Sequence, residues 1–308
     1  MKVGFKTFQQ FHGKQHIGSS RIRAEWVAKY WDEAEIFKMG AKYDVVIYQK
    51  VYWIEHAKLF KGVKILDICD PDWFHWGMRV KEMIDLCDAV TTSTLELAKA
   101  VVKFTDKPVW YIPDRLDLEL FKGQKKVHKG EAKIAAWYGY SENFPMLDGA
   151  VPSLVKNKFE ELIVIASRRS PYKLPPALEA REKVRKLPDG TKEVYMDAAK
   201  IAVSNLPWSE ATVNGDLLKA DIVINPRGTK GRWKFKSNNK TIMSWALGLP
   251  VAHSEEEMTL LIPEAARKVE AEIRLKEVKE KYDVKISVQE FKNLIAEIER
   301  SRNEHSTS

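Results

Sequence analysis

The chain contains 308 residues, of which 44% are hydrophobic and 31% charged, and it carries a formal net charge of +8 at pH 7. This composition excludes a mostly disordered chain, and the length suggests about two domains, each with its own core. The two cysteines, Cys69 and Cys87, exclude a disulfide framework and lack the spacing of a metal site, so we expect buried thiols in a reducing compartment.

The chain opens at Met1 directly into a strand-like run, without a basic-then-apolar leader. No apolar run approaches the roughly 18 residues that cross a bilayer. We therefore expect a cytoplasmic protein with no transmembrane segment. The positive charge still allows a polyanionic partner, a phosphate-bearing substrate or peripheral contact with an anionic membrane.

Short apolar runs alternate with helical patterns through the first half of the chain. The runs predict strands at 2–8, 34–37, 43–49, 64–68, 89–92 and 109–112, with helices at 20–31 and 94–104. Ser93 and Glu96 have the spacing of a capping box at the start of the second helix. Alternating β and α elements predict a doubly wound, Rossmann-like domain, which we place at 1–117.

A polar, lysine-rich stretch after Pro113 predicts a linker, placed at 118–131. A second alternating series then predicts another Rossmann-like domain at 132–262. Its strands are expected at 133–137, 162–166, 200–203, 221–225 and 250–253, with helices at 145–155 and 239–247. The Pro- and Lys-rich stretch 168–193 reads as irregular.

Helices are predicted from 263 to 308, packing back on the body. Ser287 and Glu290 have capping-box spacing before an apolar stripe of Phe291, Leu294, Ile295 and Ile298. A helix that closes the core of one domain would account for this stripe.

Three groups of residues carry a resemblance to a known family. The first is Asp88–Ser93 followed by Val109–Asp117, the second is Lys133–Leu147, and the third combines Ala220–Pro226, Phe235–Lys240 and Ala246–Val251. In this order and spacing, over residues 85–255, the chain resembles the family 4-like glycosyltransferases of the GT-B fold. The resemblance implies an α/β protein with two Rossmann-like domains facing each other across a cleft. It also implies a metal-independent, hexosyltransferase-like enzyme that holds a nucleotide-sugar co-substrate mainly in the second domain and needs no other cofactor.

The third group also makes physical sense as an anion site. A predicted strand ends at Pro226, and a loop rich in lysine and arginine then leads into a helix near Asn238. Backbone N–H groups and the positive end of a helix dipole attract phosphate. With the resemblance, this gives the candidate donor-binding residues Gly139, Arg168, Arg232, Lys236, Ser237, Asn239 and Lys240. A solvated loop and a nucleic-acid contact remain alternatives, since Arg232–Lys236 interleaves aromatic and basic residues.

The chain departs from the family at two positions. Phe235 and Met243 stand where such enzymes carry a pair of glutamates, and neither side chain can accept a hydrogen bond from a ribose hydroxyl. Either another residue binds the ribose, or the chain has lost donor chemistry. Arg168 and Arg169 are the nearest candidates for the family's usual basic pair.

Candidate catalytic residues follow the predicted strand 64–68. Asp70, Asp72 and His75 would lie beyond its carboxyl end, where open α/β sheets bind ligands, and two adjacent carboxyl groups can raise the pKa of one of them. An Asp-Pro turn with packed aromatic residues is the alternative. Ser19, Ser20 and Arg21 are candidate acceptor-binding residues, with a plain helix N-cap as the alternative.

His12 and His16 are spaced as metal ligands could be but lack a third ligand nearby, so no metal site is expected. The sequence thus predicts a glycosyltransferase with an unidentified acceptor, phosphate-bearing molecules and nucleic acid among the options. Its rivals are a non-catalytic GT-B-like binding protein and a nucleic-acid-binding protein that uses the basic stretch 227–240.

Overall fold

The computed structural model describes residues 1–13, 17–166, 170–176, 178, 181–186, 192–197 and 201–306. By packing, the chain divides into two compact units. The first unit comprises 1–120, 229–242 and 279–308, and the second comprises 121–228 and 243–278. The chain therefore passes between the units at four points, whereas the expected boundaries involve one linker and a returning tail. The domain boundaries expected from the sequence remain a prediction.

The first unit contains a six-stranded parallel sheet in the order β2-β1-β3-β4-β5-β6. Its strands are β1 (Val3–Thr7), β2 (Ala34–Ile36), β3 (Val45–Gln49), β4 (Val63–Ile68), β5 (Ala89–Thr92) and β6 (Val109–Tyr111). All six match expected strands within a few residues at each end. Val3 pairs with Ala34 on one side and Val45 on the other. The strand order thus reverses at β1, and the crevice beyond β1 and β3 is where such sheets bind ligands.

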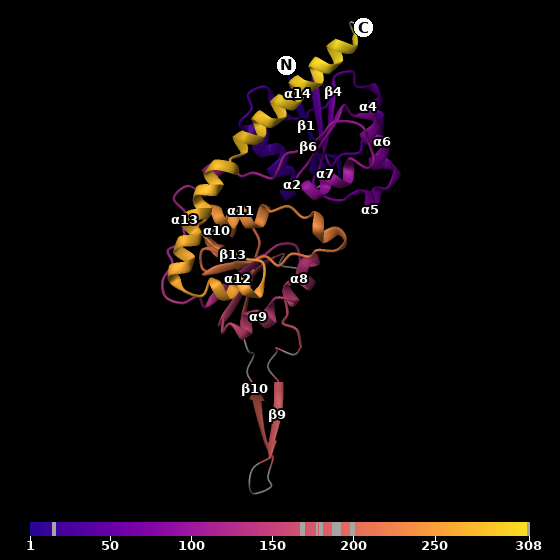
Figure 1. Ribbon diagram of the computed structural model, residues 1–308. Helices are drawn as coiled ribbons and strands as arrows, with labels where there is room; N and C mark the ends of the chain where they lie inside the picture. Colours follow the sequence, from indigo (N-terminus) through magenta and orange to yellow (C-terminus); the bar gives the residue numbers. More distant parts are fainter. Residues whose placement is uncertain are drawn as a thin grey trace. The chain divides into compact units, whose positions relative to one another are not determined.

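Helices cover both faces of this sheet (Figure 1). They are α1 (Phe8–Phe11), α2 (Gly18–Ser20), the π-helical η1 (Arg21–Glu25), α3 (Trp26–Lys29), α4 (Ile54–Leu59), α5 (Trp73–Trp76), α6 (Met78–Leu86), α7 (Leu95–Val101) and α14 (Val284–Ser306). The expected helix 20–31 is therefore three consecutive short helical pieces. Between β6 and the second unit lies a short 3₁₀ turn, η2 (Leu118–Phe121).

Alternation along the strands assigns residues to the two faces of the sheet. The ring of Phe5 in β1 meets the rings of Trp31 and of Phe291 in α14, at centroid distances of 6.2 and 5.9 Å. On the other face, Tyr48 and Leu66 pack in one cluster with residues of α4, α6 and α7. The apolar stripe predicted at the C-terminal end thus closes the core of the first unit.

Both predicted capping boxes are wrong. The N-cap of α7 is Thr94, whose hydroxyl accepts from the amide of Leu97 at 3.1 Å. Ser287 and Glu290 lie inside α14, where they bind the guanidinium of Arg115 instead, at 3.0 Å for Ser287 Oγ and 2.8 Å for Glu290 Oε1. A buried cation supplied by a distant segment outcompetes the local cap.

The second unit contains a five-stranded parallel sheet in the order β11-β8-β7-β12-β13. The strands are β7 (Ile134–Tyr138), β8 (Glu161–Ala166), β11 (Ala202–Pro207), β12 (Ile222–Ile224) and β13 (Val251–Ala252). Strand β11 lies a few residues later than the expected 200–203. Here the order reverses at β7, beside β12.

The helices that begin in or lead into this unit are mostly short. They are η3 (Ser141–Asn143), α8 (Phe144–Asp148), α9 (Val151–Lys156), α10 (Val213–Leu217), η4 (Gly231–Phe235), α11 (Asn239–Ala246), α12 (Glu255–Leu260) and α13 (Glu264–Lys281). By packing, η4 and the first turn of α11 belong to the first unit, as does the end of α13. Gly248 ends α11 at a φ of 70°, as a glycine after a helix should.

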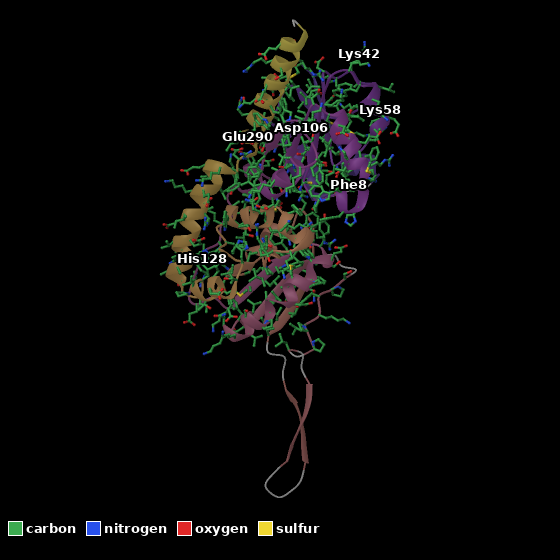
Figure 2. The ribbon with its side chains drawn as sticks, turned by 45° about the vertical axis from the view of Figure 1, so that its right-hand side comes forward. Phe8, Lys42, Lys58, Asp106, His128 and Glu290 are labelled. Atoms are coloured by element: carbon green, nitrogen blue, oxygen red, sulfur yellow. The ribbon has the colours of Figure 1, made fainter. Side chains whose placement is uncertain are left out.

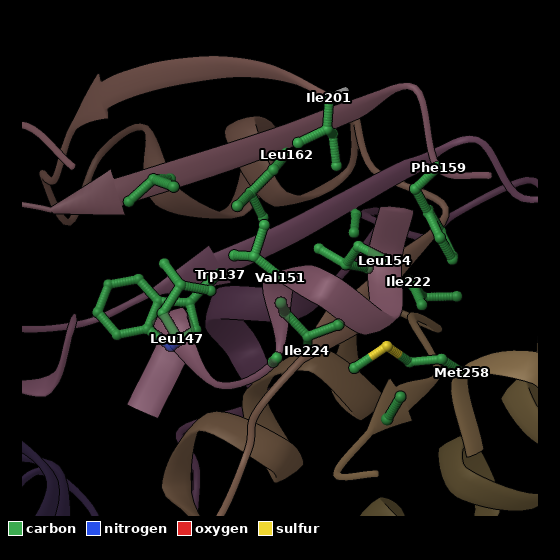
Figure 3. Packing of buried hydrophobic residues seen from close by; sticks show 14 of the residues in the cluster. Trp137, Leu147, Val151, Leu154, Phe159, Leu162, Ile201, Ile222, Ile224 and Met258 are labelled. Carbon is green, nitrogen blue, oxygen red and sulfur yellow. The ribbon is translucent and has the colours of Figure 1, made fainter. Parts of the chain in front are cut away.

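A dense apolar core holds the second unit together (Figure 3). Trp137 and Leu147 are almost fully buried, as are Val151, Leu154 and Ile222. Alternate residues of β7 and β8 and the inner faces of α8, α9 and α12 contribute to it. Burial of this kind contributes about 25 cal/mol per Å² of apolar surface to the stability of the unit.

The expectation of an irregular stretch at 168–193 is wrong for part of it. Strands β9 (Arg181–Lys186) and β10 (Lys192–Asp197) pair antiparallel, with Val184 opposite Val194. The intervening sequence contains Pro188-Asp189-Gly190, a turn signal that the reading by lysine and proline content overlooked.

Cys69 and Cys87 are free and buried, as expected, and burial raises the pKa of both thiols. None of the helices in the described ranges combines the length and the apolar character needed to cross a bilayer.

Candidate functional site

Polar side chains gather at the carboxyl edge of the sheet in the first unit. Gln49 is the last residue of β3 and is fully buried. Its side-chain oxygen accepts from Ser20 Oγ at 2.9 Å and from the amide of Phe8 at 3.3 Å. This side chain thus connects the end of β3 with the segment that follows β1, at the point where the strand order reverses.

The centre of the site is Asp70, which lies just beyond β4. One carboxylate oxygen accepts from Lys50 Nζ at 2.7 Å and the other from Lys236 Nζ at 3.0 Å. Burial alone would raise the pKa of Asp70, but the two ammonium groups outweigh it and hold that pKa below its usual value. Asp70 is therefore an anion held between two cations.

Asp72 lies deeper than Asp70 and behaves differently. Its side chain is 9% exposed, against 29% for Asp70. Tyr52 Oη donates to it at 2.7 Å, and Lys50 Nζ lies 3.6 Å away. Burial, with a smaller contribution from the charge of Asp70, raises the pKa of Asp72. The pKa values of these two neighbouring carboxyl groups are therefore shifted in opposite directions.

His75 does not join this pair. It lies in the last turn of α5 with its side chain exposed. Its amide donates to the carbonyl of Asp72 at 3.0 Å, which fixes the turn. Asp70 and Asp72 form one cluster, and His75 lies at its rim.

The segment proposed to bind the acceptor lies next to the same edge. Ser20 is buried and bonded to Gln49, Ser19 is half-buried within α2, and the guanidinium of Arg21 lies 5.5 Å from the ring of Trp26. Ile17 is the N-cap of α2 and Ser20 is the N-cap of η1, and neither makes a side-chain capping hydrogen bond. The acceptor-binding role of Ser19, Ser20 and Arg21 remains a prediction.

A buried ion network lies behind the carboxyl edge. Arg23 in η1 binds both carboxylate oxygens of Asp67, at 2.7 and 2.6 Å, and reaches Asp114 at 3.0 Å. Thr91 Oγ1 donates to Asp67 at 2.7 Å. All four side chains are buried. This network fixes the ends of β4 and β5 relative to the first helical segment.

Lys236 reaches Asp70 because its neighbour Phe235 is anchored in the first unit. Phe235 is 4% exposed, and its ring meets those of Trp73 and Phe74 at centroid distances of 5.5 and 6.4 Å. Thr94 Oγ1 donates to the Phe235 carbonyl at 3.5 Å. Phe235, which the resemblance aligned with a glutamate, is therefore an apolar anchor next to the lysine that binds Asp70.

The remaining residues of the basic stretch flank this anchor. Arg232 is exposed, with its guanidinium 4.7 Å from the ring of Trp233. Ser237, Asn239 and Lys240 are half-buried around the start of α11. The side-chain nitrogen Nδ2 of Asn239 is buried and lacks a hydrogen-bond partner among the described atoms. Met243, at the second glutamate position, is 7% exposed and packs within the second unit.

At the switch point of the second unit, Gly139 follows β7 with a φ of 155° and donates its amide to the carbonyl of Ile165 at 3.1 Å. Across the switch point, His253 Nδ1 lies 2.8 Å from the carbonyl oxygen of Asn225, which joins the ends of β12 and β13. Arg168, the other predicted donor-binding residue in this unit, lies outside the described residues, as do Arg169 and His16.

Sequence reasoning missed Lys50, Tyr52 and Gln49. The signal was available. Gln49 ends the expected strand 43–49 and Lys50 follows it directly, just as Asp70 follows the next strand, and parallel strands end at the same edge. Side chains are drawn in Figure 2, where Phe8, whose ring lies 5.1 Å from the Lys50 ammonium, is labelled.

We also considered metal-binding and ligand-binding sites elsewhere in the described part of the chain. No cluster of three or more His, Cys, Asp or Glu residues there could hold a metal ion. A hollow of about 550 Å³ lies at the opposite, amino edge of the first sheet, lined by residues that include Tyr43, Lys61 and Arg302. It contains none of the carboxyl-edge residues, so we do not place the active site there.

Two parallel α/β sheets, each with a switch point at its carboxyl edge, define a class of ligand-binding proteins. No protein-family model matches the sequence, and no curated protein matches it. Solved structures do match. T4 phage β-glucosyltransferase aligns with a TM-score of 0.55 and 12% identity, over 96% of this chain and 99% of that one.

Two further structures give similar values. An O-GlcNAc transferase from Thermobaculum terrenum aligns with a TM-score of 0.54 and 12% identity, over 99% of this chain and 69% of that one. TarM aligns with a TM-score of 0.52 and 11% identity over 87% of this chain, which spans 56% of TarM. The chain has the GT-B fold, as expected, and its structural neighbours include glycosyltransferases. At this identity the likeness establishes the fold, and assignment to family 4 stays a prediction.

Proposed function

We propose that this chain is a glycosyltransferase that moves a sugar from a nucleotide-sugar donor to an acceptor nucleophile. The observation that carries the proposal is the Lys50–Asp70–Lys236 cluster, which sets a partly exposed carboxylate between two cations at a sheet's carboxyl edge. The GT-B fold supports it, since neighbours of that fold are glycosyltransferases.

In this proposal the basic stretch binds the donor diphosphate. Lys236, Lys240 and Arg232 would balance the charge that develops on the leaving phosphate, so that no metal ion is needed for that purpose. Ser237 and the unpaired amide of Asn239 would donate hydrogen bonds. Gly139, which has no side chain at the carboxyl end of β7, and Arg168 remain predicted donor-binding residues of the second unit.

Asp70 is the proposed general base, because it is the more exposed member of the carboxyl pair. Its carboxylate takes the proton from an acceptor hydroxyl, the acceptor oxygen bonds to the anomeric carbon, and the bond from that carbon to the phosphate oxygen breaks. The nucleoside diphosphate leaves with the electron pair. Asp72 would support Asp70 from behind, while His75, Ser19, Ser20 and Arg21 would line the acceptor side.

The test is a screen of UDP-, GDP- and ADP-sugars for released nucleotide, with the wild-type chain and Lys240→Ala. We expect turnover of one donor class and its loss in the variant, because a phosphate-binding cation is gone. Lys103→Ala is the matched control, since Lys103 is an exposed lysine just after α7. Undiminished turnover in Lys240→Ala would refute the donor assignment.

The second candidate is a non-catalytic binding protein on the same scaffold. Phe235 and Met243 favour it, because both are packed in cores where the family carries carboxylates. Titration calorimetry with UDP, GDP and ADP separates the two ideas: no heat of binding with any of them favours the second candidate. Binding of nucleic acid that weakens steeply with salt and needs no nucleotide would point instead to the basic stretch as a nucleic-acid site.

A further inference from the structure

Lys50 adopts a backbone conformation that lysine rarely adopts. It follows β3 directly, and its φ of 53° lies in the left-handed region. Its amide donates to the carbonyl of Asp67 at 2.9 Å, which holds this turn in place. Glycine would adopt this conformation without strain, and strained backbone of this kind concentrates at functional sites. The side chain at position 50 therefore needs an explanation.

That side chain is directed at both carboxyl groups. It is 13% exposed, and its ammonium lies 2.7 Å from Asp70 and 3.6 Å from Asp72. The centre of the Phe8 ring lies 5.1 Å from the Lys50 ammonium, and the face of an aromatic ring favours the positive charge of that group. Burial would lower the pKa of Lys50, but the neighbouring acidic groups Cys69, Asp70 and Asp72 outweigh burial and raise it, which favours the charged ammonium.

Lys236, the other partner of Asp70, differs in each respect. Its side chain is 49% exposed, and its only ion pair in the described structure is with Asp70. It lies in the loop between η4 and α11, beyond the anchor Phe235. An exposed lysine on a loop can exchange a carboxylate for a more highly charged phosphate at little cost.

We infer that Lys50 is a positioning residue, the fixed counter-ion that orients Asp70 and keeps it ionised, whereas Lys236 is an exchangeable partner that the donor phosphates take over. This inference rests on the proposed function. When Lys236 turns to the donor phosphates, Asp70 loses one of its two neighbouring cations, so the pKa of Asp70 rises and Asp70 becomes a stronger base. Lys50 stays beside Asp70 and keeps its carboxylate ionised. Donor binding thereby activates the base.

The pKa of Asp70 depends on the ionisable groups that face it. They are Lys50 and Lys236, with Asp72, Tyr52 and the thiol of Cys69. Burial raises the pKa of both Tyr52 and Cys69, so these two stay neutral near pH 7. Among the described groups that face Asp70, Lys50 is thus the cation that remains after Lys236 is removed.

The experiment compares Lys50→Met, Lys50→Arg and Lys236→Met in the full chain. Aspartate labelled with ¹³C at the carboxyl carbon is titrated by NMR, with Asp70→Asn to assign the signal. We expect Lys50→Met to raise the pKa of Asp70 in the absence of any nucleotide, and Lys50→Arg to leave that pKa close to the wild-type value. Adding UDP to the wild-type protein should raise the pKa of Asp70, as the substitution Lys236→Met should. Should Lys50→Met fail to fold, Lys50→Gln, which keeps a donor without the charge, carries the same comparison.

Kinetics supply the second readout, with the donor that the screen identifies. Lys50→Met should lower kcat by about 100-fold with little change in donor KM, and move the acid limb of the pH profile to higher pH. Lys236→Met should mainly raise donor KM. An unmoved Asp70 titration in Lys50→Met would overturn the inference even in an active enzyme. Conversely, absence of turnover with every donor would sink the proposed function and leave the NMR result to decide the role of Lys50.

Discussion

Replacing Phe235 with alanine should release the 229–242 segment from the first unit. The ring is 4% exposed and meets Trp73 nearly edge-on, with an interplanar angle of 86°. Removing a well-packed phenylalanine costs about 3–5 kcal/mol. One neighbour, Phe74, is itself 57% exposed, so the surroundings can relax and the low end applies, about 3 kcal/mol.

That cost should appear as local detachment before global unfolding, because the segment is short and bounded by chain crossings. Since about 1.4 kcal/mol is a factor of ten, the detached population should rise on the order of 100-fold. A lysine-specific protease reports this population through the rate of cleavage after Lys234 and Lys236, read by mass spectrometry. Both lysines flank the lost ring, so the cut sites are specific to the segment.

Leu95→Ala is the matched control. Leu95 is an apolar residue of the same unit with 54% of its surface exposed, and its loss should leave cleavage at Lys234 and Lys236 unchanged. Cleavage of Phe235→Ala at the wild-type rate would refute the reasoning, because the segment would then be held by something other than this ring.

Three further outcomes are expected. Arg23→Met leaves buried carboxylates unpaired and should lower the free energy of unfolding, measured with urea, by about 3–5 kcal/mol. Adding Asp67→Asn to this variant should recover part of the lost stability. If the effects of the two substitutions simply add, the pairing of Arg23 with Asp67 is contradicted. Cys69 and Cys87 should react with a thiol reagent only after denaturant is added, and fast labelling of the native chain would argue against their burial. Because the pKa of Asp70 is lowered on folding, its contribution to stability is fully present above its unfolded pKa of about 4 and is lost as the pH falls through its folded pKa. The difference in unfolding free energy between wild type and Asp70→Asn should therefore shrink only below about pH 4. A difference that shrinks toward alkaline pH would contradict the direction of this pKa shift.

Much of the fold could be predicted because it depends on short-range patterns. The strands β1 to β6 are continuous apolar runs, and a parallel sheet covered on both faces requires such runs. The hairpin β9–β10 was missed because the lysine and arginine content of the stretch was weighed more heavily than the Pro188-Asp189-Gly190 sequence, which is typical of turns. The two capping boxes failed for different reasons. Thr94 rather than its neighbour Ser93 caps α7, whereas Ser287 binds Arg115, which is 172 residues away and which no local rule pairs with it.

The candidate site was predictable only in part. Asp70 and Asp72 follow from the rule that ligands bind beyond the carboxyl ends of parallel strands. The approach of Lys236 to Asp70 spans 166 residues and depends on where Phe235 packs, which no sequence pattern specifies. The place of Lys50 at the sheet edge could have been predicted from the expected strand before it, whereas its left-handed backbone has no signature in the sequence.

The four chain crossings have a consequence for biosynthesis. Residues 279–308 belong to the first unit, so its core stays incomplete until the ribosome has released nearly the whole chain. The second unit is likewise interrupted by 229–242. No single cut yields two contiguous fragments that each contain one whole unit, and a truncated transcript ending before α14 would leave the sheet face around Phe5 bare to solvent and to chaperones.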